Sequence, residues 1–122
     1  MITEDYVSFE VAKLLKEKGF NVPCRSHYWN EELVETEEPL DAQKIKYWFS
    51  APTHQMACKW LREVHKICIV VYPFTHRERG TYTSDICTVT MTMEEGHLRG
   101  VWNNYEEAVE ATLKYCLKNI EK

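Results

Sequence analysis

The residues best suited to chemistry lie in one short segment, residues 50–65, which reads SAPTHQMACKWLREVH. Within it His54 and Cys58 are four residues apart, a spacing that places both on one side of a helix, one turn from each other. Two chemistries use such a pair. A cysteine can act as a nucleophile with a histidine as its general base, or both side chains can bind one metal ion.

A metal site requires more ligands than this segment can bring to one point. His65 follows Cys58 by seven residues, which corresponds to about 10 Å along a helix axis. Cys68 lies still further on, in a predicted strand, and the spacing matches no common zinc pattern. At most two ligands converge, so we predict no metal site, and nothing in the sequence indicates a cofactor.

A nucleophilic role for Cys58, with His54 as its base, stays open as an alternative. Catalysis would also require a residue that orients the base and donors that stabilise an oxyanion, and the sequence indicates neither. The four glycines form no phosphate-binding motif of the GxxxxGKS/T or GxGxxG type. We therefore expect a chain that is not an enzyme.

The helix that carries these residues is predicted at about 53–66, with Thr53 as its N-cap. Its apolar arc contains Met56, Ala57, Trp60, Leu61 and Val64. We expect Trp60 to be the core anchor, because the strand that follows lays the helix back on a sheet. The indole would then be buried against residues such as Val70 and Val89.

Two further helices and several strands complete the predicted structure. Hydrophobic periodicity predicts an amphipathic helix at 6–20, closed by Gly19, and a second that begins at Asn104 as N-cap. In the second helix, Glu110 and Lys114 are expected to pair on the exposed side. Alternating or apolar runs predict strands at 24–29, 33–35, 44–49, 66–74, 81–93 and 97–102.

This order of elements favours an α+β fold, because helices stand at both ends and in the middle with hairpins between them. A chain of 122 residues is long enough for one domain with a single modest core. We therefore predict a single α+β domain over 1–122. Its sheet is expected to be mainly antiparallel, with three to five strands and about three helices packed on one face.

Acidic side chains are concentrated in one part of a chain whose net charge is −4. Residues 30–41 contain no base and carry Glu31, Glu32, Glu35, Glu37, Glu38 and Asp41. Because like charges repel one another, we expect a solvated surface loop at 35–43, within the least determined region, 21–49. Residues 44–79 are rich in lysine and arginine, so nucleic-acid binding there is a further alternative. The acidity of the whole chain disfavours it.

Cysteine content and hydropathy indicate where the protein is found. The five cysteines are odd in number and widely spaced, which is typical of reduced thiols inside a cell. The N-terminus lacks the pattern of a signal peptide. The longest apolar run, ICIVVYPF, is too short to span a bilayer. We expect a cytoplasmic protein that makes no membrane contact.

Aromatic side chains flank the acidic segment on both sides. Tyr28 and Trp29 precede it, and Tyr47 and Trp48 follow it. Such rings either fill the core of a small domain or form a recognition surface, and the sequence leaves both interpretations open. These four residues are our candidate binding residues.

Three segments of the chain carry a resemblance: YVSFEVAKLLKEKGF, APTHQMACKWLREVH and NNYEEAVEATLKYCL. They resemble small uncharacterised proteins of gut-type anaerobic bacteria that are encoded by prophages or other mobile elements. The part PTHQMACKWLRE is the most specific. The group has no established activity, so the resemblance implies a small intracellular accessory protein and assigns no catalytic residue.

These observations together predict a non-catalytic accessory protein that acts by binding an unknown protein partner. The partner can also be a second copy of the chain, which would make a homo-oligomer. A small enzyme that uses Cys58 and His54, and a nucleic-acid binder that uses residues 44–79, are the alternatives.

Overall fold

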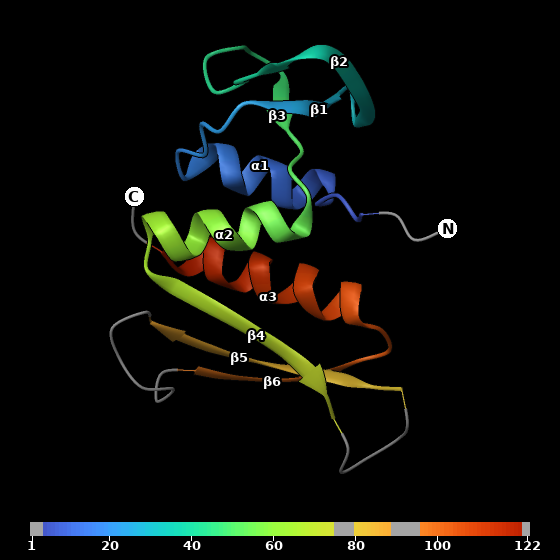
Figure 1. The fold of residues 1–122 in the computed structure, drawn as a ribbon, viewed down its shortest axis with the longest axis vertical. Helices are drawn as coiled ribbons and strands as arrows, with labels where there is room; N and C mark the ends of the chain where they lie inside the picture. Colours follow the sequence, from blue (N-terminus) through green and yellow to red (C-terminus); the bar gives the residue numbers. More distant parts are fainter. Residues whose placement is uncertain (1–3, 75–79, 89–95, 121–122) are drawn as a thin grey trace.

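The computed structural model describes residues 4–74, 80–88 and 96–120 of the chain. Within these residues it contains three helices and six strands (Figure 1). Their order along the chain is α1 (Phe9–Glu17), β1 (Cys24–Trp29), β2 (Glu32–Leu40), β3 (Trp48–Ser50), α2 (His54–Val64), β4 (Ile67–Pro73), β5 (Tyr82–Thr88), β6 (Gly96–Trp102) and α3 (Tyr105–Asn119).

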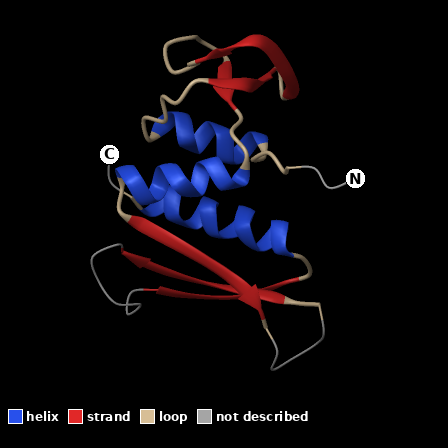
Figure 2. Ribbon diagram, in the orientation of Figure 1, coloured by secondary structure: helices blue, strands red, loops and turns tan. Residues whose placement is uncertain are grey.

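The strands form two separate antiparallel sheets with the helices between them (Figure 2). The first sheet has the order β2-β1-β3, and the second has the order β4-β5-β6. α1 packs against β3, whereas α3 packs against all three strands of the second sheet. The predicted α+β class, with antiparallel strands and about three helices, is confirmed. None of the described helices is long and apolar enough to cross a membrane.

Two of the three described helices begin at their predicted capping residues. The side chains of Thr53 and Asn104 accept hydrogen bonds from backbone N–H groups in the first turns of α2 and α3. α1 is capped by Ser8 and ends before Gly19, whose φ of 93° is accessible to glycine. The N–H of Phe20 then donates to the carbonyl of Leu15, which closes the helix as a Schellman motif.

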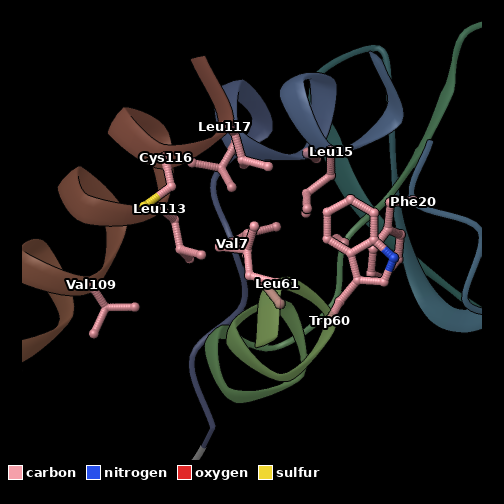
Figure 3. Packing of buried hydrophobic residues seen from close by; sticks show 13 residues of the cluster. Val7, Leu15, Phe20, Trp60, Leu61, Val109, Leu113, Cys116 and Leu117 are labelled. Carbon is pink, nitrogen blue, oxygen red and sulfur yellow. The ribbon is translucent and has the colours of Figure 1, made fainter. Parts of the chain in front are cut away.

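The hydrophobic core lies within the helical layer, where side chains of all three helices meet (Figure 3). Trp60 is only 6% exposed and packs edge-to-face on Phe20, with ring centroids 5.4 Å apart. Its predicted burial is therefore confirmed. The predicted contact with Val70 is wrong, because Val70 lies on the opposite face of β4 from Ile69 and Val71 and is 38% exposed. Residues 89–95, which include the expected neighbour Val89, lie outside the described part of the chain.

Two members of the predicted apolar arc of α2 are not in the core. Met56 is 42% exposed and Val64 is 56% exposed, whereas Ala57 and Leu61 are fully buried. The predicted apolar arc is wider than the buried face of α2, which is a stripe centred on Trp60 and Leu61.

Two predictions for the region between the first two helices are wrong. The acidic segment expected as a loop at 35–43 forms most of β2, which pairs with β1. A strand with this many carboxylates is tolerated because β2 is an edge strand and its carboxylates are exposed to solvent. Val34 and Thr36 of the same strand are half-buried. The strand expected at 44–49 is reduced to Trp48–Ser50, because Tyr47 has a φ of 67°, which no extended strand can contain.

Candidate functional site

The outer face of the first sheet brings most of the candidate binding residues together. Trp29 of β1 lies directly opposite Trp48 of β3, so both indoles project from the same face. Trp29 is 48% exposed, and Tyr47, which precedes Trp48, is 69% exposed. We call Trp29 and Trp48, together with Tyr47 in the turn immediately before β3, the aromatic face.

Tyr28 is the exception, because it projects from the other side of the sheet, toward α1. Its ring packs edge-on against Phe9 at a centroid distance of 5.6 Å. Its hydroxyl donates a hydrogen bond of 2.8 Å to the carbonyl of Val7. Tyr28 therefore helps to hold the sheet on the helices and is not part of the aromatic face.

A buried histidine lies beside Trp48, on the same side of the sheet. His27 is completely buried, and its ring lies 5.5 Å from that of Trp48. Its Nε2 is 2.9 Å from the carbonyl of Leu40 and must donate, since a carbonyl oxygen can only accept. The imidazole thus links β1 to the end of β2 beside the Trp48 ring.

Lys16 of α1 fixes the backbone that carries the aromatic face. Its Nζ donates to the carbonyl oxygens of Ile45 at 2.5 Å and Trp48 at 2.7 Å, and it lies 5.0 Å from the centre of the Phe49 ring. The pKa of Lys16 is lowered, because the effect of burial exceeds the opposing effect of the nearby carboxylate of Asp41. This one side chain therefore holds the turn before β3 against the helix.

Carboxylates border the aromatic face on the β2 side. Glu32 is the register partner of Trp29, and Glu31 stands in the turn between β1 and β2. We call the exposed carboxylates of β2 the acidic edge; they are Glu32, Glu35, Glu37 and Glu38. Glu32 shares the face of Trp29, whereas Glu35 is paired with Ser26 and projects from the side of Tyr28. The aromatic face is therefore bordered by a negatively charged edge strand.

The two catalytic candidates of the sequence, His54 and Cys58, line a second feature, a pocket of about 390 Å³ between α2 and α3. His54 Nε2 lies 2.7 Å from Glu110 Oε2 of α3, and the same oxygen accepts the backbone N–H of Ser8 at 3.0 Å. Burial alone would raise the pKa of Glu110, but the hydrogen bonds from His54 and Ser8 lower it below its ordinary value. Glu110 is thus a charged junction between α2, α3 and the N-terminal segment.

The thiol in this pocket is not activated. Burial raises the pKa of Cys58 to about 11, despite the opposing effect of Arg62, so the group is protonated at neutral pH. The thiolate is the nucleophilic form of cysteine. Among the described residues, no group of three histidine, cysteine or acidic side chains is arranged to hold a metal ion. The pocket therefore contains an imidazole oriented by Glu110 beside a protonated thiol.

Sequence reasoning identified His54 and Cys58 but missed Glu110, which was expected to pair with Lys114. Lys114 instead pairs with Glu10 of α1 at 2.8 Å. The partner of His54 is 56 positions away in the chain, so no local pattern signals the contact.

Comparisons with known proteins do not place the chain in a family. No family model matches the chain, and no curated protein or solved structure is similar to it.

Proposed function

We propose that this chain is a non-catalytic accessory protein that binds a basic segment of another protein on its aromatic face. The observation that carries this proposal is the exposure of Trp29, directly opposite Glu32 of the acidic edge, together with that of Tyr47 next to Trp48. Exposed tryptophan and tyrosine are frequent anchors of protein interfaces. Aromatic rings attract lysine and arginine through cation–π contacts, and carboxylates bind the same cations by charge-assisted hydrogen bonds.

The charge distribution supports a basic protein over a nucleic acid. The acidic edge would repel phosphates from the aromatic face, and the whole chain has a net charge of −4. The protonated thiol of Cys58 supports binding over catalysis. The resemblance to proteins of mobile elements fits an accessory role, and we include such an origin in the proposal.

Photo-crosslinking in cells that express the protein tests the site of binding. Tyr47 is replaced by p-benzoylphenylalanine, and the captured protein is identified by mass spectrometry. The matched control carries the same residue in place of Val101, which is 46% exposed on β6 of the other sheet. We expect a basic protein to be captured from position 47 and not from position 101.

The captured protein is then purified and titrated with the wild-type chain and with Trp29→Ala. Loss of an interface anchor costs about 2 kcal/mol or more, so we expect binding to weaken about thirtyfold. Higher salt should weaken binding further because the contacts are charged. Unchanged affinity of a folded Trp29→Ala variant, or capture of the chain by itself, would contradict the proposal.

A further inference from the structure

The 390 Å³ pocket lies beside the outer strand of the second sheet. β4 is at one edge of the order β4-β5-β6, and α2 packs against it. Ile69 of β4 lines this pocket. His54, Cys58 and Arg62, which stand on three successive turns of α2, form the opposite wall.

The edge of β4 is suited to receive another strand. Within the described part of the chain, β4 pairs only with β5, so its other side presents backbone donors and acceptors. Edge strands are commonly protected by charged residues or proline. β2 has both kinds of protection, whereas Ile67–Pro73 reads ICIVVYP and carries no charge, with its one proline at the end.

The pocket beside this edge has a chemistry that selects a side chain. Cys58, Ile69 and Val109 give it apolar walls. Its carboxylates are those of Glu4, Asp5 and Glu106, which outnumber the guanidinium of Arg62. A lysine or arginine fits this combination, because its aliphatic stem can lie on apolar groups while its charged end reaches carboxylates.

We propose that an extended segment of a partner protein adds to β4 as a further strand and inserts a lysine or arginine side chain into this pocket. In such β-augmentation the backbone hydrogen bonds supply affinity, and a pocket for alternate side chains supplies specificity. Side chains of a strand alternate between its two faces, so a cationic residue enters the pocket while its neighbours point away from the helices. The site is distinct from the aromatic face and does not depend on it.

A short synthetic peptide, acetyl-STVTKTVTS-amide, serves as the probe, and amide chemical shifts of the labelled protein report binding. We expect saturable shifts in residues 67–72 and along α2. A peptide with glutamate in place of the lysine should bind more weakly, and one with proline on both sides of the lysine should not bind. No saturable shift at millimolar peptide would overturn the proposal, as would shifts centred on residues 27–29 and 48–50.

A matched pair of variants tests the role of the pocket. Glu106 and Glu107 are both exposed in the first turn of α3, but only Glu106 is among the residues that line the pocket. We expect Glu106→Lys to weaken the lysine peptide about tenfold, and Glu107→Lys to change binding less than about twofold. Equal effects in two folded variants would overturn the proposal. Concentration-dependent shifts of β4 without peptide would also overturn it, because they would identify a second copy as the occupant.

The two experiments can fail separately. The peptide titration concerns residues of α2, α3 and β4, whereas the crosslinking experiment concerns position 47 on the other sheet.

Discussion

The two sheets each contain three antiparallel strands but are attached to the helices in different ways. The first sheet meets α1 through the rings of Phe9, Tyr28 and Phe49 and through the ammonium group of Lys16. The second sheet lies under α3, where Ser84 of β5 hydrogen-bonds Thr112 at 2.7 Å in a fully buried position. One attachment is aromatic and partly charged, and the other is a buried hydroxyl pair within an apolar layer.

The two sheets also differ in the composition of an edge strand, β2 in the first and β4 in the second. β2 carries four glutamates and a proline, whereas β4 carries no charged residue. A charged edge prevents further strands from pairing, and an uncharged edge permits it. This difference is the reason why the two proposals place a side-chain surface on the first sheet and strand addition at the edge of the second.

The largest effect is expected from Trp60→Ala, because both sheets pack on the helical layer that Trp60 helps to fill. Truncation of a buried tryptophan costs about 3–5 kcal/mol, out of a total of about 5–15 kcal/mol for a domain. Urea denaturation should therefore show a protein close to unfolding, with both sheets lost together. Met56→Ala, one turn earlier and 42% exposed, is the control and should cost less than about 1 kcal/mol. Equal losses for the two variants would place the indole outside the core.

An intermediate effect is expected from Thr112→Val, which alters only the attachment of the second sheet. The Thr112 hydroxyl donates to the carbonyl of Ala108 at 2.7 Å, so the Ser84 hydroxyl must donate to Thr112. Valine keeps the shape but leaves the buried Ser84 hydroxyl without its acceptor, which costs about 1–3 kcal/mol in the free energy of unfolding. The double variant with Ser84→Ala should recover part of this loss in denaturation experiments. A double variant less stable than Thr112→Val would contradict this explanation.

The smallest effect is expected from Lys16→Met, which alters only the attachment of the first sheet. The variant removes the two hydrogen bonds to the backbone at Ile45 and Trp48, each worth about 0.5 kcal/mol at this partly exposed site, while the stem of methionine still covers Phe49. Hydrogen exchange should accelerate in β3 and leave β5 unchanged. Lys13→Met is the control, since Lys13 lies over the ring of Phe9 instead. Faster exchange in both sheets would show that they are not attached independently.

The sequence was sufficient for features that depend on neighbours along the chain. Thr53 and Asn104 cap helices because a cap bonds to N–H groups only two or three residues away. The burial of Trp60 followed from helical periodicity, and the strand at 24–29 followed from its composition and from the turn after it. These signals depend on residues close together in the chain, so a single sequence is enough to detect them.

The tertiary structure decided the features that depend on distant residues. β2 is a strand because β1 supplies its hydrogen-bonding partner, a gain that outweighs the repulsion among exposed carboxylates. Tyr28 and Trp29 are adjacent in sequence, yet one faces α1 and the other faces solvent, because strand register assigns their sides. Glu110 meets His54, and the pocket beside β4 forms, only when α2 from the middle of the chain packs against α3 near its C-terminal end. Spacing along the chain cannot encode such contacts, since they arise from the free energy of the whole packed core.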